Sequence, residues 1–137
     1  MRSIIVKGRT IVEGHCKAKA LVSARPLSFL GGVDPSNGKI IDKNHDLFGR
    51  CLKGKVLCFP HGHGSTVGSY VLYSLAQNEL APKAIVNQTA DPVVVVGAII
   101  ADIPMIDQVN IKQIHTDDLI EINANKGTIT ITRKSES

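Results

Sequence analysis

The sequence predicts an α/β domain with a β-rich core and flanking helices, on three observations. Residues 55–59 form a short apolar run that is typical of a buried strand. Residues 66 to about 80 follow it with apolar side chains at helical spacing. Near the C-terminus, residues 119–124 and 128–132 alternate apolar and polar side chains around Asn125-Lys126-Gly127, which indicates a β-hairpin. Strand, helix and hairpin in one chain favour a mixed fold.

The other expected elements follow in chain order. Residues 3–7 and 17–23 carry β-forming or alternating side chains and predict two early strands. Residues 83–87 predict another short strand, and residues 103–106 a further β-like piece. Residues 93–101 are apolar throughout, so periodicity leaves open both a buried strand and a short buried helix.

Residues 26–38 carry dense turn signals, with Gly31-Gly32, Asp34-Pro35 and Asn37-Gly38 close together. Long ordered loops in compact domains often bind ligands or act as lids, so this segment is a candidate contact region. Asn37-Gly38 between apolar residues is also a strong hairpin signal. The two interpretations are compatible.

The length of 137 residues is that of one domain, and we expect a single domain over residues 1–137. Hydrophobic residues make up 43% of the chain and charged residues 20%, which is typical of a globular protein. The longest apolar run, 93–101, is shorter than the ~18 residues of a membrane span. The chain reaches Glu13 without a sustained apolar stretch, so we expect no secretory signal and predict a cytoplasmic protein.

The charge pattern argues against nucleic acid as a partner. Lys and Arg number 16 against 12 Asp and Glu, which gives a net charge of +4, and the basic residues are scattered. Nucleic-acid-binding domains usually combine a basic stripe with stacking aromatic residues, whereas aromatics are 4% here and Trp is absent. A small anionic substrate or an acidic partner surface explains a mild positive balance as well.

The cysteines Cys16, Cys51 and Cys58 are an odd number without a C-x-x-C pair, which predicts reduced thiols rather than disulfides. Their spacing is much wider than in the runs that bind iron–sulfur clusters. We therefore expect them to be small, largely buried hydrophobic residues.

The glycine-rich stretch 61–73, HGHGSTVGSYVLY, lies between the predicted strand and the predicted helix. Gly62, Gly64 and Gly68 permit positive φ and allow another molecule to approach the backbone closely. Ser65 falls where a helix N-cap is expected, and there the free N–H groups and the helix dipole favour an anion. A hydroxyl at that position can take part in chemistry.

Two structural alternatives stand beside this interpretation. Serine and threonine are ordinary N-cap residues, so Ser65 or Thr66 could simply cap the helix. A nucleotide-binding P-loop needs a lysine directly before its Ser or Thr, and here Gly64 precedes Ser65. Ser69, one turn further along, is a weaker candidate for chemistry because it is expected to face the packing.

The histidines of the chain do not form a recognisable metal site. His61 and His63 form an H-x-H pair, but zinc sites need three or four ligands and a second cluster is missing. These imidazoles more plausibly add positive potential near Ser65. His45 and Asp46 could act as acid or base, but neither has a visible partner in the sequence.

Several separated motifs resemble one family, the small subunit of the aconitase X type, which corresponds to the swivelling domain of aconitases. The motifs are Gly8-Arg9 with Gly14, then PLSFLGGVDPSNGKIID, GKVLCFPHGHGSTVGSYVLY, APKAIVN and ADPVVVVGAIIADIPMID. They occur in the family's order and cover most of the chain. Within the family, the short separate chain is most similar to the small subunits of archaeal phosphomevalonate dehydratases.

The resemblance implies a swivelling β/β/α domain that acts with a second chain. A large subunit would carry a 4Fe–4S cluster, with no metal on this chain, and the small subunit would supply a serine base at the position of Ser65. The substrate would be small and anionic, namely 5-phosphomevalonate, which loses water to give trans-anhydromevalonate 5-phosphate in a mevalonate route to isoprenoids. The residues expected to line it are Gly64, Thr66, Gly31, Gly32 and Asp91.

One departure from the family pattern concerns the residues after the serine. In aconitases proper the serine is followed closely by an arginine that binds a substrate carboxylate, whereas here Thr66 and Val67 follow. A tricarboxylic substrate is therefore not expected. Two alternatives to phosphomevalonate dehydration remain: dehydration of cis-3-hydroxyproline by the same family, and a non-catalytic interaction module in which Ser65 only caps a helix.

Overall fold

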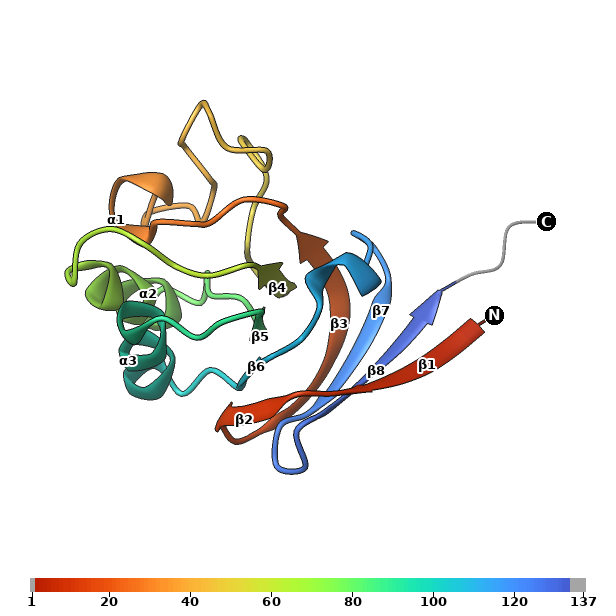
Figure 1. The fold of residues 1–137 in the computed structure, drawn as a ribbon. Helices are drawn as coiled ribbons and strands as arrows, with labels where there is room; N and C mark the ends of the chain where they lie inside the picture. Colours follow the sequence, from red (N-terminus) through yellow and green to blue (C-terminus); the bar gives the residue numbers. More distant parts are fainter. Residues whose placement is uncertain (1, 134–137) are drawn as a thin grey trace.

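The computed structural model describes residues 2–133 and forms one curled sheet with helices on one side (Figure 1). Within that range the sheet has eight strands in the order β1-β8-β7-β3-β4-β5-β6-β2. The strands are β1 (Arg2–Lys7), β2 (Arg9–Val12), β3 (His15–Val22), β4 (Val56–Phe59), β5 (Ala84–Asn87), β6 (Met105–Asp107), β7 (Leu119–Asn123) and β8 (Thr128–Arg133). The helical segments are α1 (Phe29–Gly32), α2 (Gly68–Gln77), α3 (Pro92–Ala101) and the 3₁₀ turn η1 (Ile111–Gln113).

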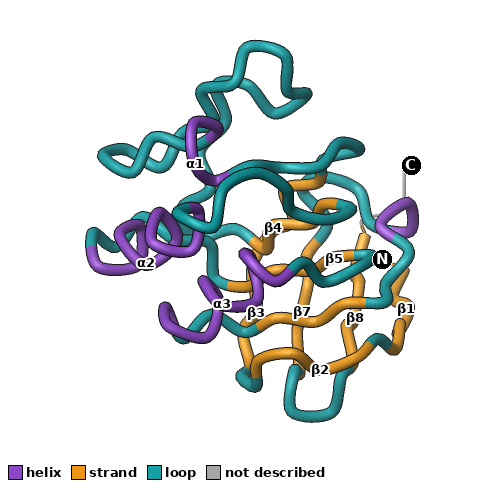
Figure 2. Tube along the Cα trace, turned by 60° about the vertical axis from the view of Figure 1, so that its left-hand side comes forward, coloured by secondary structure: helices purple, strands orange, loops and turns teal. Residues whose placement is uncertain are grey.

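The sheet has a parallel half and an antiparallel half, which share β3. Strands β3, β4, β5 and β6 pair in parallel, while β1, β8, β7 and β3 pair antiparallel. The crossovers β4-α2-β5 and β5-α3-β6 place both long helices against the parallel half, as Figure 2 shows. The predicted α/β class, with a β-rich core and flanking helices, is confirmed.

Most of the predicted elements are present, and the structure adds β2, α1 and η1, which were not predicted. The strand at β2 was not predicted, because it has only four residues and directly follows Gly8; it pairs antiparallel with β6. The segment 93–101, which periodicity left open, is the helix α3. Its start is specified locally, since the Asp91 carboxylate accepts the Val94 N–H at 3.0 Å and Pro92 occupies the first turn.

The core has two layers because both faces of the central strands are covered. Along β4 all four residues are buried, with Leu57 and Phe59 packed on the helix side and Val56 and Cys58 on the opposite side. Such continuous burial is expected where a parallel sheet is covered on both faces. Among residues 2–133, the helices fall short of the length and hydrophobicity of a membrane-spanning segment.

Helices α2 and α3 lie parallel and in close contact, since each follows a strand of the parallel half. A Cβ placed on Gly68 would lie 3.2 Å from Val93 Cγ1, near the start of both helices. Further along, a Cβ on Gly97 would lie 2.6 Å from Leu72 Cδ1 and 3.3 Å from Ser69 Cα. The two N-termini therefore lie at the same edge of the sheet, above the carboxyl ends of the strands.

Replacing Gly97 with alanine is expected to reduce the free energy of unfolding by about 1–2 kcal/mol. Overpacking costs roughly 1–3 kcal/mol, and the better helix propensity of alanine returns up to about 1 kcal/mol. Urea denaturation measures the change, with the exposed Val96→Ala as a control that should stay within about 0.5 kcal/mol of wild type. A Gly97→Ala variant as stable as wild type would contradict the close packing of α2 on α3.

A buried carboxylate joins the end of the C-terminal hairpin to the turn before it. Arg133 donates to both oxygens of Asp118, at 2.8 and 2.7 Å, and the His115 N–H donates to the same carboxylate at 2.8 Å. These hydrogen bonds, led by that from Arg133, hold the pKa of Asp118 below its usual range.

The pH dependence of stability is expected to reflect this pair. Because the folded-state pKa of Asp118 is lower than the unfolded value, its contribution is complete above about pH 5 and is lost as the pH falls below about 4. Asp118→Asn should be less stable at pH 7 and should lose less stability than wild type between about pH 5 and pH 2. Urea denaturation across this range tests it, and parallel pH curves for the two proteins would contradict it.

Candidate functional site

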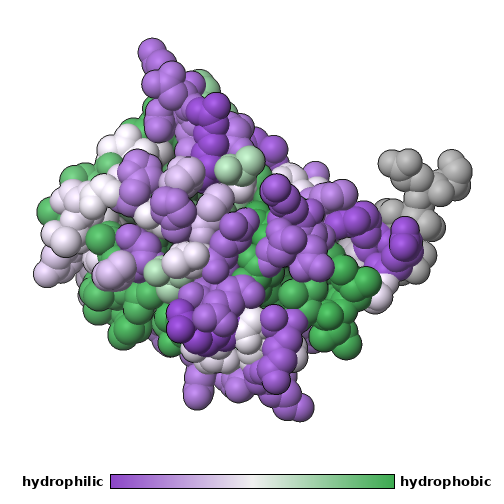
Figure 3. Space-filling model, viewed as in Figure 1, coloured by the Kyte–Doolittle hydropathy of each residue, from purple (hydrophilic) through white to green (hydrophobic). Residues whose placement is uncertain are grey.

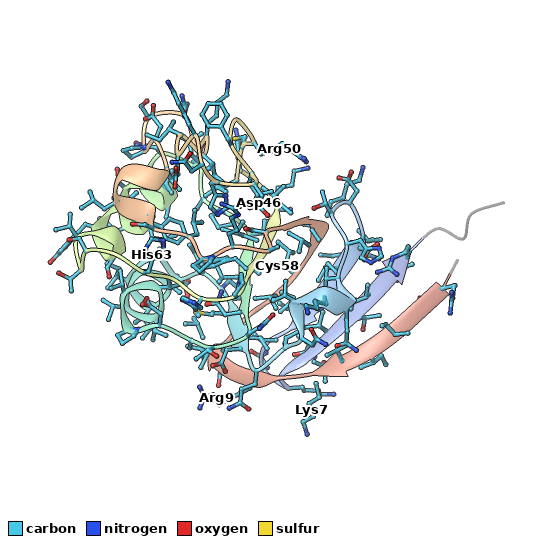
Figure 4. The ribbon with its side chains drawn as sticks, turned by 45° about the horizontal axis from the view of Figure 1, so that its top comes forward. Lys7, Arg9, Asp46, Arg50, Cys58 and His63 are labelled. Carbon is cyan, nitrogen blue, oxygen red and sulfur yellow. The ribbon has the colours of Figure 1, made fainter. Side chains whose placement is uncertain are left out.

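The segment 60–67 connects β4 to α2 and lies over the carboxyl ends of the parallel strands. Leu27 forms a parallel β-bridge with Gly62 of this segment. The Leu27 N–H donates to the His61 carbonyl, and the His63 N–H donates to the Leu27 carbonyl, each at 3.2 Å. Figure 4 places His63 close to α1. The glycine-rich segment is therefore held beside the turn-rich loop that the sequence marked as a second contact region.

Ser65 is exposed on this segment. Its hydroxyl oxygen accepts the Val67 N–H at 3.1 Å, and among residues 2–133 that is its one hydrogen-bond partner. The regular helix α2 begins at Gly68 with Val67 as its cap residue, two residues later than the N-cap predicted at Ser65. The turn between them runs into the helix without a break, since the Gly68 N–H donates to the Ser65 carbonyl at 2.9 Å and the Ser69 N–H donates to the Thr66 carbonyl at 3.2 Å. Ser65 thus lies just ahead of the helix, with its hydroxyl open to solvent.

Gly64 and Gly62 permit the close approach of two neighbouring segments. Gly64 has φ of +93°, and a Cβ there would lie 2.4 Å from the Ser28 hydroxyl oxygen. A Cβ on Gly62 would lie 2.4 Å from Val94 Cγ2 and 3.0 Å from Asp91 Oδ1. The segment that carries Ser65 is therefore fitted between the 27–31 loop and the start of α3.

Ser28 is a residue that the sequence analysis did not select. Its hydroxyl donates to the Leu30 carbonyl at 2.9 Å, which fixes it against Gly64. The available signal was its place as the single polar side chain in the apolar part of the PLSFLGG motif. Serine is common in turns, so that signal alone does not distinguish a site residue.

The predicted substrate-lining residues occupy different environments. Thr66 is exposed beside Ser65, and Gly31 is exposed with φ of +81° and open space where a Cβ would stand. Gly32 is buried, and its carbonyl accepts the Ile41 N–H at 2.9 Å, so it supports the turn. Asp91 caps α3, and its Oδ1 would lie 3.0 Å from a Cβ placed on Gly62. The fold brings these segments around Ser65, and their contact with a substrate stays a prediction.

Ser69 has the packing role that the sequence predicted for it. It is buried, and its hydroxyl donates to the Val93 carbonyl at 2.6 Å, which joins α2 to the first turn of α3. A hydroxyl that is fully engaged inside the helix pair is not available to a substrate.

The two histidines of the segment are both exposed. His61 contacts its neighbour's carbonyl, with 2.8 Å between Nδ1 and the Gly62 oxygen. Within residues 2–133 no group of three or more His, Cys, Asp or Glu side chains is arranged to hold a metal ion. Their influence on the potential near Ser65 stays a prediction.

The base of the 23–28 segment is held by a polar cluster in which Ser23 and His45 are buried and Asp46 is exposed. The Ser23 hydroxyl donates to Asp46 Oδ1 at 2.6 Å, and the Ala24 N–H donates to Asp46 Oδ2 at 2.8 Å. His45 accepts the Leu47 N–H at 3.1 Å through Nδ1, which leaves Nε2 to donate to the Pro26 carbonyl at 3.1 Å. His45 and Asp46, which lacked a visible partner in the sequence, therefore have structural ones.

A second buried carboxylate fixes the turn that leads into α3. Arg9 donates to both oxygens of Asp107, at 2.9 and 2.7 Å, and the Ala90 N–H donates to the same carboxylate at 2.9 Å. The Gly8-Arg9 motif thus acts through Asp107 on the position of residues 90–91. Each of these polar clusters fixes a segment that borders Ser65: the first holds residues 23–28, and the second holds residues 90–91.

The two helix N-termini supply positive potential at this edge, and the Asp91 carboxylate supplies a negative charge at the start of α3 and beside Gly62. Neither α2 nor α3 has an acidic residue in its first turn, and Asp91 precedes the first turn of α3 as its cap. Positive helix ends favour an anion or a developing negative charge. Two cavities, of about 350 and 140 Å³, lie elsewhere, and neither is lined by Ser65. The Ser65 region is therefore an open surface that another molecule must enclose before it forms a closed site.

Comparison with known proteins identifies the family of this chain. The family described as "Aconitase X swivel domain" matches residues 5–131. The chain belongs to the aconitase X swivel domain family. It is 52% identical to a phosphomevalonate dehydratase small subunit from Thermococcus sibiricus, over 92% of this chain and 97% of that one. It is 45% identical to the protein of the same name from Methanosarcina mazei, over 99% and 96% of the two chains.

A solved structure agrees with the family assignment. The crystal structure of Thermococcus kodakaraensis aconitase X in its holo-form superposes with a TM-score of 0.93, at 46% sequence identity, and covers 95% of this chain and 99% of that chain. The swivelling β/β/α fold expected from the resemblance is thus confirmed. This aconitase X swivel domain presents Ser65 as an exposed residue at its strand-to-helix turn.

Proposed function

We propose that this chain is the small subunit of a dehydratase that removes water from (R)-5-phosphomevalonate to give trans-anhydromevalonate 5-phosphate. The substrate comes from the names of the relatives, which match at 45–52% identity over nearly their whole length. The observation that carries the role of this chain is Ser65, which is exposed at a glycine-rich turn beside two helix N-termini. The reaction would belong to a mevalonate route to isoprenoids.

In this proposal Ser65 is the base. It takes a proton from the carbon next to the substrate carboxylate, the hydroxyl departs from the neighbouring carbon, and a double bond forms between the two. A serine hydroxyl is a weak base at neutral pH, so its oxygen must be stabilised in the deprotonated form. The Val67 N–H, which donates to this oxygen at 3.1 Å, and the N-terminus of α2, which has no acidic cap, supply that stabilisation.

The partner in this proposal is a large subunit that carries the iron–sulfur cluster, whose iron would supply Lewis-acid chemistry for the departing hydroxyl. The thiols of this chain do not fit such a cluster. Cys58 is fully buried in β4, where burial raises the pKa of its thiol. Cys58 pairs with Val22 of β3, and Cys16 lies six residues before Val22 on the same strand. Six residues of a strand span about 20 Å, so Cys16 and Cys58 are too far apart to bind one cluster. Cys51 lies outside the named strands.

The test is dehydration of 5-phosphomevalonate by this chain combined anaerobically with the cluster-bearing large subunit from the same source. Turnover is expected from the mixture and not from either chain alone. A stable complex with an intact cluster that fails to turn over this substrate would overturn the substrate assignment.

A further inference from the structure

The outer surface of the helix pair lacks the polar character expected of a solvent-exposed face. Helices α2 and α3 have ten residues each, and neither contains a charged residue. Large apolar or aromatic side chains are exposed along both, which we call the helical face: Val67, Tyr70, Tyr73, Val96, Ile99 and Ile100. In Figure 3 hydrophobic residues gather at the lower left, where Figure 1 places α3.

A helix that covers one side of a domain normally carries polar residues on its outer face. Helix α3 is instead apolar all round, with Val94 and Ala98 buried and Ile99 57% exposed. Such a pattern is typical of a helix that is covered on every side. Tyr70 and Tyr73 are the only tyrosines of the 137-residue sequence, and both are exposed here. Tyrosine is enriched in the centres of protein interfaces.

The helical face is continuous with the surface around Ser65. Val67 is two residues from Ser65 and donates its N–H to the Ser65 hydroxyl. Because α2 and α3 run parallel, the face begins at this turn and extends from it along both helices. A molecule that encloses Ser65 from the solvent side therefore meets Val67 and Tyr70 first.

We propose that the helical face is the docking surface for the large subunit that encloses Ser65. The inference rests on the proposed function, since that function requires a second chain over the same edge. Helices of ten residues are about 15 Å long and pack 8–10 Å apart, so the face covers roughly 300 Å². A standard interface buries about 800 Å² on each partner, so the helical face supplies its apolar part and the glycine-rich segment extends the same interface over Ser65.

A second copy of this chain is a less suitable occupant. Two copies that packed through the helical face would cover Val67 and the turn beside Ser65 on both chains. That arrangement and a large subunit over Ser65 exclude each other. The absence of charge on both helices also indicates an apolar partner surface, so the affinity should depend little on salt.

The experiment compares two isoleucine variants that differ only in location. Ile99→Glu places a charge in the helical face, and Ile5→Glu places the same charge at Ile5, which is 73% exposed on the edge strand β1. Binding of the purified full-length chain to the large subunit is measured anaerobically by titration calorimetry, without substrate. Ile99→Glu and Tyr70→Ala are each expected to raise the Kd at least tenfold, with Ile5→Glu within about twofold of wild type.

Unfolding free energies and sedimentation of the variants alone complete the test. Ile99 is exposed, so its variant should remain folded. Wild-type affinity in a folded Ile99→Glu protein would overturn the proposal, and so would a wild-type homodimer that this variant dissociates without affecting large-subunit binding. Because binding is measured without turnover, a failed phosphomevalonate assay beside weakened binding would reject the substrate and leave the docking surface intact.

Discussion

Replacing Ser65 with alanine is expected to lower turnover of the assembled dehydratase by about 10²–10⁴-fold, the range that a positioned acid or base contributes. The hydroxyl oxygen has one hydrogen bond within residues 2–133, from Val67, and the side chain is exposed. Its removal should therefore cost no more than about 1 kcal/mol of stability. Steady-state kinetics with saturating large subunit, beside calorimetric binding and urea denaturation, separates these effects.

Ser69→Ala is the matched control for this variant. Ser69 is four residues further along the chain, but its hydroxyl is buried and donates to the Val93 carbonyl. Its loss should cost about 1 kcal/mol of stability and leave kcat close to wild type. If Ser65→Ala instead kept its activity and lost only stability, Ser65 would be a structural residue and the chain an interaction module.

Replacing Gly64 with alanine is expected to have the second largest effect, a loss of turnover of about 10²-fold or more with the protein still folded. The new Cβ would lie 2.4 Å from the Ser28 hydroxyl at a φ of +93°. Either the backbone turns or Ser28 moves, and both displace the neighbouring Ser65. Kinetics of the reconstituted enzyme measures the loss, and urea denaturation should show a cost of about 1–3 kcal/mol.

Gly49→Ala is the control that separates backbone strain from collision. Gly49 also has a positive φ, of +85°, but nothing lies within 4 Å of the position of its Cβ, and it is not among the predicted site residues. Its substitution should therefore cost about 1–2 kcal/mol of stability with a much smaller effect on kcat. The double variant Ser28→Gly with Gly64→Ala should recover part of the lost activity. A Gly64→Ala enzyme as active as Gly49→Ala would contradict the role of the Ser28 contact.

The local sequence contained enough information for most of the fold. Apolar runs bounded by turn residues identified the strands around residues 55–59 and 83–87, since burial on both faces leaves a continuous hydrophobic stretch. The ambiguity at 93–101 had a physical cause: α3 is apolar on its exposed side as well as on its buried side, so no polar face reveals its period. Asp91 and Pro92 were the local signals of that helix, and their meaning depended on the crossover between β5 and β6.

What the sequence by itself determined is the chemistry available at one turn: a serine, glycines and an apolar strand and helix on either side, in motifs specific enough to indicate the family. What only the tertiary structure decided is how that turn is positioned. Ser28 against Gly64, Asp91 against Gly62, and the Asp107 carboxylate between Arg9 and Ala90 join segments far apart in the chain. Local propensity contains no information on such contacts, because they arise from the packing of elements that are separated in sequence.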